Sequence, residues 1–255
     1  MGRRHLHLHE TVDIVGQGQY DYMAHVGREP TNEMPGMLTL QGTFFVCAVG
    51  GGRWPQVINL WDVGDDGWEA WAANVDRLNL KRRHAFYGEW WDEASRWRSG
   101  GFDRLCGGVP GSPSTAELAE RGVSGTLFVH QLLQVRPGAV LDHLGRVVDE
   151  QVPLWREHGH EPTGIYEVLG NQHEAVVVWA TSIAAQARLR AARDAALGFD
   201  TGVEADDRLL GWERRSAELV TGGETVLMTP QPGTVYGPDD WEEATLDDWL
   251  HPGAP

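Results

Sequence analysis

The order of hydrophobic and polar positions divides the chain into two similar series of elements. Short runs rich in Val, Ile and Phe alternate with longer stretches whose apolar residues recur every three or four positions. These two periods are typical of strands and amphipathic helices. In the first half the pattern predicts strands over 5–15, 40–49, 56–63 and 101–106, with helices over 17–27, 66–79 and 88–98. In the second half it predicts strands over 125–135, 162–169, 174–181 and 223–229, with helices over 138–157, 183–197 and 205–219.

The two halves also match residue by residue. His9 corresponds to His130 and Trp61 to Trp179, and the pair at 100–101 corresponds to the pair at 222–223. Internal repeats on this scale indicate duplicated structural units. Each half therefore predicts the order strand, helix, strand, strand, helix, strand, which is a ferredoxin-like βαββαβ unit.

One βαββαβ unit alone leaves a face of its antiparallel sheet uncovered. Two units in one chain can cover each other, so the sequence predicts an α+β fold in which two ferredoxin-like units form a pseudo-dimeric α+β barrel. We expect the units at 1–106 and 124–230, joined by a Gly/Pro/Ser-rich linker at 107–123. An acidic tail at 231–255 follows, which we expect Trp241 and Trp249 to hold in place.

Residues 152–192, VPLWREHGHEPTGIYEVLGNQHEAVVVWATSIAAQARLRAA, resemble the NIPSNAP domain of the dimeric α+β-barrel superfamily. The shared pattern is a Trp-x-x-His-Gly turn, a strand that begins at glycine, a Gly-Asn turn, a strand ending in an apolar-Trp pair and an Ala/Arg-rich helix. The resemblance implies the barrel fold. It leaves the function open, because superfamily members include cofactor-independent monooxygenases of antibiotic biosynthesis and heme-binding or heme-degrading proteins. NIPSNAP domains often carry Arg and Tyr on the first strand, where this chain has Glu10 and Val12.

The charge of the chain excludes several classes of partner. Thirty-seven Asp and Glu residues against 21 Lys and Arg residues give a formal net charge of -16. We therefore expect no nucleic acid and no anionic membrane as a partner. The start MGRRHLHLHE lacks the apolar core of a signal peptide, and there are only two cysteines, which favours a cytoplasmic protein. We expect a small-molecule substrate and a monomer or homodimer.

The predicted first strand carries a carboxylate on its apolar face. Glu10 interrupts a row of apolar residues that should pack on the helices, because a strand alternates its side chains between two faces. Burial there would raise the pKa of the Glu10 carboxyl and suit it to general acid/base catalysis. The alternative is a solvent-facing Glu10 at a strand bend.

The opposite face of the same strand carries His5, His7 and His9. Three imidazoles on one face can hold Zn, Cu or Fe. The alternative is that His5 and His7 are solvated and that His9 is a hydrogen-bonded barrel residue like His130. No second ligand cluster with helical spacing accompanies them, so we predict no bound transition metal.

Tryptophan is unusually frequent, with 12 residues in the chain. Most of them fall in the first half, whereas two copies of one fold would need similar numbers for their cores. The first half is therefore predicted to hold a cavity for a flat ligand. Its predicted substrate-binding residues are His7, His9, Trp61, Trp68, Trp71 and Trp90. Its predicted catalytic residues are Glu10, Tyr20, Tyr22, His25 and Asp62. For Trp61 a core role, for His25 a surface role and for Asp62 a helix cap are the alternatives.

Two functions from different classes remain open. The first is a small-molecule enzyme, of natural-product biosynthesis, that acts on an aromatic or polyketide-like substrate by cofactor-free oxygenation, cyclisation or isomerisation. The second is a non-catalytic module that binds a small molecule or heme, with a histidine such as His25 as the axial ligand. The sequence lacks the glycine-rich motifs of dinucleotide and P-loop sites. No cofactor is predicted for the enzyme, and heme is the alternative.

Overall fold

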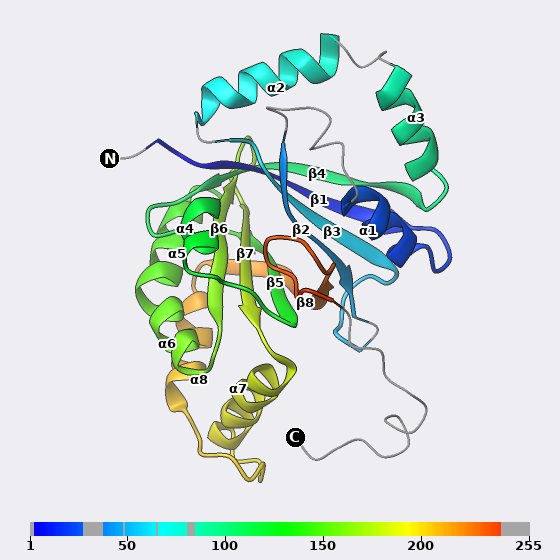
Figure 1. The fold of residues 1–255 in the computed structure, drawn as a ribbon. Coiled ribbons are helices and arrows are strands. Elements are labelled where there is room, and N and C mark those ends of the chain that lie inside the picture. The colour runs from blue at the N-terminus through cyan, green and yellow to red at the C-terminus, as the bar shows by residue number, and fades with distance from the viewer. Residues whose placement is uncertain (1–2, 28–37, 48, 65, 81–84, 241–255) are drawn as a thin grey trace, which may run out of the picture.

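The computed structural model describes residues 3–27, 38–47, 49–64, 66–80 and 85–240. Eight strands form a closed barrel in the order β1-β3-β2-β8-β5-β7-β6-β4 (Figure 1). The first half supplies β1 (Leu6–Ile14), β2 (Thr39–Val46), β3 (Gln56–Asp62) and β4 (Arg98–Gly108). The second half supplies β5 (Leu127–Val135), β6 (Glu161–Val168), β7 (Glu174–Thr181) and β8 (Val220–Pro230). The predicted α+β barrel of two ferredoxin-like units is confirmed.

Two antiparallel seams join the halves. At one seam β2 pairs with β8, and Val46 lies opposite Met228. At the other seam β4 pairs with β6, and Cys106 lies opposite Val168. Exchanging the two halves converts one seam into the other, so a pseudo-twofold axis runs along the barrel.

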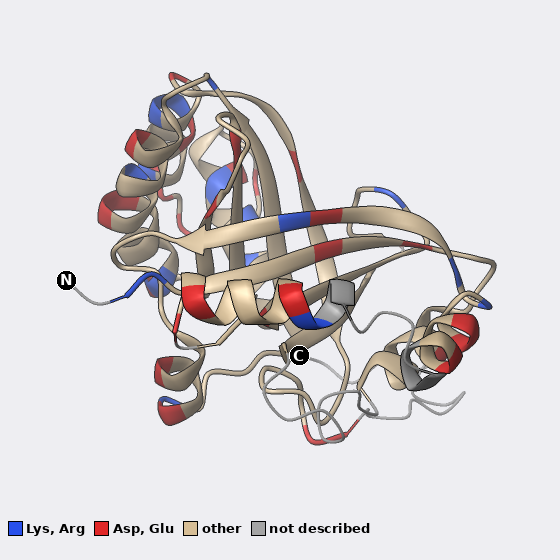
Figure 2. Cartoon of the chain, turned by 90° about the horizontal axis from the view of Figure 1, so that it is seen from above, with Lys and Arg blue, Asp and Glu red and all other residues tan. Residues whose placement is uncertain are grey.

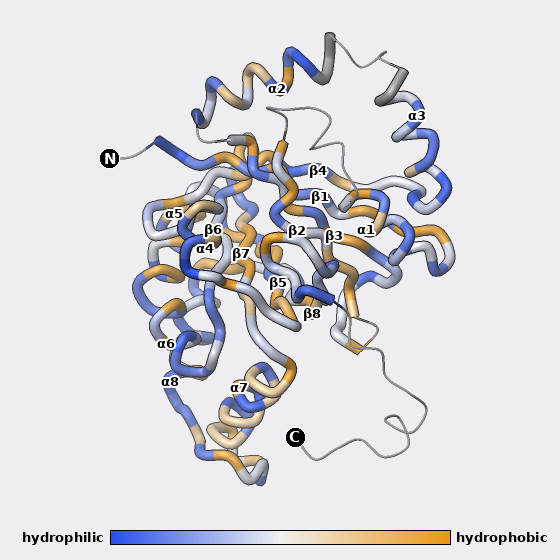
Figure 3. The backbone as a smooth tube through the Cα atoms, viewed as in Figure 1, coloured by the Kyte–Doolittle hydropathy of each residue, from blue (hydrophilic) through white to orange (hydrophobic). Residues whose placement is uncertain are grey.

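The helices lie outside the barrel, against the strands of their own half (Figure 1). The first half has α1 (Gln19–Gly27), α2 (Trp68–Leu80) and α3 (Ala85–Ala94). The second half has α5 (Val140–Arg146), a π-helical turn (Val147–Gln151), α6 (Val152–Glu157), α7 (Ile183–Ala196) and α8 (Asp207–Ser216). Charged positions concentrate on the helices and hydrophobic positions follow the strands (Figures 2 and 3), as burial of the sheet requires.

One predicted helix, over 138–157, is interrupted in the structure. It is built from α5, the π-helical turn and α6, and Pro153 lies in the first turn of α6. Proline has no backbone N–H to donate and its ring crowds the preceding turn, so a regular α-helix cannot run through this position.

Two segments close the same mouth of the barrel, and each follows the last strand of its half. The predicted linker contains α4 (Thr115–Glu120), which begins at a capping box of Ser114 and Glu117 and buries Leu118 in the barrel interior. Residues 231–240 follow β8 and bury Tyr236 beside Phe128, with ring centroids 6.1 Å apart. Tyr236 thus anchors residues 231–240; Trp241 and Trp249, which were expected to hold the tail in place, lie outside the described residues.

Matching bulges in β2 and β6 depend on glycine. The strand register shifts just before Gly42 in β2 and just before Gly164 in β6. A Cβ atom on Gly42 would lie 2.5 Å from the Phe44 ring, and one on Gly164 would lie 2.1 Å from the Tyr166 ring. Both rings pack in the barrel interior, so each bulge leaves room for an aromatic side chain.

The Gly164→Ala variant is expected to unfold with a free energy lower by about 1–3 kcal/mol, because Tyr166 must move within a packed core. Gly145→Ala is the matched control, since nothing lies within 4 Å of its added Cβ on α5. It is expected to be neutral or stabilising by up to about 1 kcal/mol. Chemical denaturation measures both values, and equal losses would contradict the proposed crowding.

Candidate functional site

The two faces of the first-half sheet divide the predicted site residues. Glu10 and Trp61 lie on the face that packs against the helices, near Tyr22. His7 and His9 point into the barrel, and Asp62 lies opposite His7 at the barrel mouth. The predicted residues therefore do not form one site.

Glu10 is the centre of a buried polar network. Only 8% of Glu10 is exposed, and its Oε2 accepts hydrogen bonds from Trp61 Nε1 at 2.5 Å and from Asn59 Nδ2 at 3.1 Å. Asn59 also donates to the Tyr22 hydroxyl at 3.3 Å, and Thr43 donates to Asn59 Oδ1 at 2.6 Å. No described residue donates a hydrogen bond to Glu10 Oε1. One carboxylate oxygen is thus held by two donors and the other by none of the described residues.

Burial is the main cause of the shifted pKa values of Glu10 and Tyr22. It raises the pKa of the Glu10 carboxyl above 4.5, and the nearby Asp103 carboxylate acts in the same direction. The two hydrogen bonds and the charge of Arg98 act in the opposite direction. Burial also raises the pKa of Tyr22, and Glu10 adds to that shift, so the phenol stays protonated and neutral near Glu10.

The second half repeats the tryptophan contact without the carboxylate. Gln131 Oε1 accepts from Trp179 Nε1 at 2.9 Å and from Gln151 Nε2 at 3.3 Å. In each half a tryptophan N–H therefore donates to a side chain on an inner strand: Trp61 donates to Glu10 on β1, and Trp179 donates to Gln131 on β5. Because this contact occurs in both halves, it belongs to the fold, whereas the titratable group at Glu10 is specific to the first half.

Other predicted residues of the first half lie apart from this network. Tyr20 is 52% exposed and meets Phe45 edge-on, with centroids 5.2 Å apart. His25 stacks on Trp90 at 4.8 Å, and its Nε2 lies 3.2 Å from the Trp90 carbonyl oxygen. That nitrogen is therefore bound as a donor.

Two further predicted tryptophans pair on α2. Trp68 and Trp71 meet edge-on with ring centroids 5.5 Å apart, and Trp68 is 50% exposed. Among the contacts of the described residues, none joins either ring to Glu10. Their role as walls of a substrate cavity stays a prediction.

His9 and His130 meet on the pseudo-twofold axis inside the barrel. Their Nε2 atoms are 2.8 Å apart, while the ring centroids are 5.0 Å apart and the planes differ by 13°. These values place the rings end to end, so one Nε2 donates its hydrogen and the other accepts it. Burial lowers the pKa of both imidazoles, that of His130 to about 3, and the pair is neutral at pH 7.

The predicted histidine face is thus engaged in other contacts. His7 Nε2 lies 3.0 Å from Gln41 Nε2, which donates to it, and the His7 ring lies 4.7 Å from Tyr166. Burial lowers the pKa of His7 to about 4. Within the part of the chain that the structure describes, no group of three or more His, Cys, Asp or Glu side chains could hold a metal ion.

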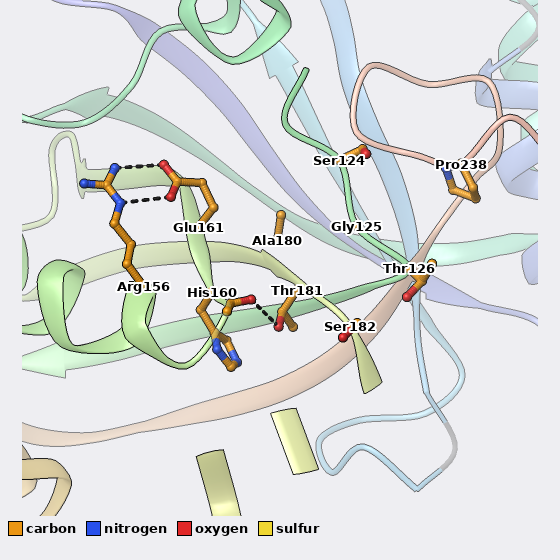
Figure 4. Close-up of a pocket in the computed structure, with 11 residues that line it drawn as sticks. Ser124, Gly125, Thr126, Arg156, His160, Glu161, Ala180, Thr181, Ser182 and Pro238 are labelled. Atoms are coloured by element: carbon orange, nitrogen blue, oxygen red, sulfur yellow. Dashed lines mark hydrogen bonds and ion pairs between the residues drawn. The ribbon is translucent and has the colours of Figure 1, made fainter. Parts of the chain in front are cut away.

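An open cavity of about 630 Å³ lies at the barrel mouth (Figure 4). Its charged groups are already paired: Arg156 binds Glu161 through two hydrogen bonds of 2.8 and 2.9 Å, and Arg121 binds the same carboxylate. His160 is held by Gln186 at 2.8 Å and by the backbone. This cavity therefore presents polar walls but no free acid or base.

The sequence prediction missed the partners of Glu10 on the neighbouring strands. Asn59 and Asp103 lie directly opposite Glu10 on β3 and β4. The available signal was a polar Asn in the apolar strand QVINLW, which needs a partner when buried. Only the register of the sheet shows that this partner is Glu10.

Comparison with known proteins identifies the fold. No protein-family model and no curated protein matches the chain. A structure named "Putative monooxygenase" from Fusobacterium nucleatum superposes with a TM-score of 0.55 at 8% identity, covering 90% of this chain and 94% of that one. The chain has the dimeric α+β-barrel fold. A second structure named "putative monooxygenase", from Lactobacillus acidophilus, gives a TM-score of 0.53 at 9% identity, covering 89% and 94%.

None of the described helices is long and apolar enough to cross a membrane. The barrel of this fold is completed within one chain, because the second half supplies the sheet that covers the first. With identities of 8% and 9%, the two superposed structures show the architecture of this chain and not its reaction.

Proposed function

We propose that this protein is a small-molecule enzyme in which Glu10 abstracts a proton from an aromatic or polyketide-like substrate. The observation that carries the proposal is the buried Glu10 carboxyl, with Oε2 held by Trp61 and Asn59 and with Oε1 unbound among the described residues. A raised pKa brings a carboxylate closer to the value that suits a general base near neutral pH.

The proton step uses the free oxygen of the carboxylate. A substrate C–H or O–H bond breaks, its electron pair stays on the substrate as an enolate or phenolate, and the proton forms a new O–H bond on Glu10 Oε1. Trp61 and Asn59 keep the carboxylate oriented through Oε2, while Tyr22 stays a neutral phenol whose oxygen accepts a hydrogen bond from Asn59. The same anion begins an isomerisation, a cyclisation or, with dioxygen as the oxidant, an oxygenation.

The tryptophans of the first half would form the walls that favour a flat substrate. The monooxygenase names of the two superposed structures favour oxygenation among the three reactions. The resemblance of residues 152–192 to NIPSNAP domains supports a relationship at the level of the superfamily, and no cofactor enters the proposed proton step.

Proton abstraction can be tested before the natural substrate is known. Wild-type protein would be incubated in D₂O with a panel of 1,3-diketones and resorcinol-type phenols, and NMR would follow deuterium entering the acidic C–H positions. An oxygen electrode in the same samples separates oxygenation from exchange. We expect catalysed exchange with at least one compound; exchange at the buffer rate across the panel, without oxygen uptake, would argue against the proposal.

The alternative is a heme-binding module, and the predicted axial ligand does not fit it. His25 is packed on Trp90 and its Nε2 is bound to a carbonyl oxygen. His143 on α5 is different, because it is buried and neither ring nitrogen has a partner among the described residues. Burial lowers the pKa of His143 to about 4, which leaves the neutral imidazole that can bind iron.

A hemin titration distinguishes these histidines. If the module binds heme, wild-type protein should develop a strong absorbance band at about 400 nm at one equivalent of hemin. His143→Ala should remove that band and His25→Ala should retain it. The enzyme proposal expects no stoichiometric band in any of the three proteins.

A further inference from the structure

A cavity of about 470 Å³ lies between the second-half sheet and helices α7 and α8. This volume lies in the range that holds small organic ligands. Its apolar wall comes from Leu189, Leu209, Trp155 and Trp212, all of them buried. The cavity is distinct from the Glu10 network, which lies on the other half of the barrel.

Two of the polar side chains that line this cavity, Gln131 and Arg190, offer it hydrogen-bond donors. Gln131 lines it, and its amide orientation is fixed because Oε1 must face the Trp179 N–H, which can only donate. The Gln131 Nε2 group therefore carries two N–H donors, and no described residue accepts a hydrogen bond from it. Arg190, also in the lining, makes no hydrogen bond or ion pair to any described residue.

The acidic group at the rim is already neutralised. Both oxygens of Glu213 are bound by Arg193, at 2.6 and 2.9 Å. Arg193 and Glu213 thus bind each other, whereas the Arg190 guanidinium feels the charges of Glu213 and Asp194 without a hydrogen bond to either. In a chain of net charge -16, this cavity offers a cation and an amide donor beside aromatic walls.

We propose that this second-half cavity binds a small aromatic carboxylate. The carboxylate accepts hydrogen bonds from the Arg190 guanidinium and the Gln131 amide, and the ring packs against Trp155 and Trp212. The repeat supports the assignment by contrast, because the position of Gln131 is taken by Glu10 in the first half. A carboxylate at this position would repel an anionic ligand. The same strand position therefore carries a proton-accepting carboxylate in the first half and a hydrogen-bond-donating amide in the second half.

Two fluorescent probes test the proposal on the full-length protein. 1-Anilinonaphthalene-8-sulfonate carries an aromatic body and an anion, and N-phenyl-1-naphthylamine has the same rings without the anion. We expect the anionic probe to bind with one equivalent and about tenfold or more tighter than the neutral probe, because a charge-assisted contact adds that factor. Equal affinities for the two probes, or no binding of either, would overturn the proposal.

Three variants locate the binding site. Arg190→Gln and Gln131→Glu should each abolish the preference for the anionic probe while leaving neutral-probe affinity unchanged; Glu at 131 can still accept from Trp179. Arg188→Gln on the same helix is the matched control and should retain the preference. An equal loss in the Arg188→Gln protein would show non-specific attraction to α7 and contradict the assignment. Circular dichroism and Tm confirm that each variant is folded.

Discussion

The Glu10→Gln protein is expected to lose about 10²–10⁴-fold in kcat, because the amide cannot accept the substrate proton. The fold should be retained, since the Gln carbonyl oxygen can still accept from Trp61 Nε1 and Asn59 Nδ2. Steady-state kinetics on a substrate found in the exchange screen measures the loss. Glu120→Gln, at an exposed carboxylate on α4, is the control and should keep full activity.

The difference in stability between the wild-type and Glu10→Gln proteins should change with pH in a definite direction. The folded-state pKa of Glu10 lies above its ordinary value of 4.5, so the folded protein binds that proton more tightly than the unfolded chain. Wild-type stability is therefore lost as pH rises from about 4.5 through the folded-state pKa, and Glu10→Gln is spared this loss. The Tm of the variant should rise relative to wild type over that range. A constant Tm difference, or equal activity of the two proteins, would remove Glu10 from the mechanism.

Acid should unfold the wild-type protein through its buried histidines. The unfolded chain takes up protons on histidine near pH 6.5, whereas burial lowers the pKa of His130 to about 3 and lowers that of His9 as well. Stability is therefore fully present above about pH 6.5 and is lost as pH falls toward the folded-state values. Since each pKa unit corresponds to about 1.4 kcal/mol, the loss is on the order of a few kcal/mol.

Replacing His130 tests whether the His9–His130 pair causes the acid unfolding. His130→Gln retains a side chain that can hydrogen-bond to His9 but cannot be protonated, so its acid-unfolding midpoint should lie at lower pH than that of wild type. His173→Gln, at an exposed turn, should unfold at the wild-type midpoint. Circular dichroism during acid titration gives both values. A His130→Gln midpoint equal to wild type would place the acid sensitivity elsewhere.

Local patterns predicted the fold because both halves bury their strands in the same way. The predicted strand 174–181 coincides with β7, and the helix over 183–197 differs from α7 by one residue. Ser182 caps α7 at its start, which is a signal contained in the sequence itself. The helix α4 was missed, although Ser114 and Glu117 form a capping box, because the glycine and proline residues before it suggested only a linker.

The candidate site was less accessible to sequence reasoning. Period two along β1 placed Glu10 on the helix-facing side and His9 on the other, and the structure has both there. The partners depend on strand pairing over long separations: Asn59 reaches Glu10 across β3, and His130 reaches His9 across the barrel. The free donors at Gln131 and Arg190 depend on which neighbouring groups are already satisfied, and no local pattern contains that information.

The shared mouth at which β4 and β8 both end has a consequence for chain connectivity. The segment through α4 carries the chain from the end of β4 to the start of β5 across that mouth. By the pseudo-twofold symmetry, an equivalent connection can lead from the end of β8 to the start of β1. The barrel therefore admits a circular permutation in which the second half precedes the first, with new termini between Gly108 and Leu127 and every strand pairing retained.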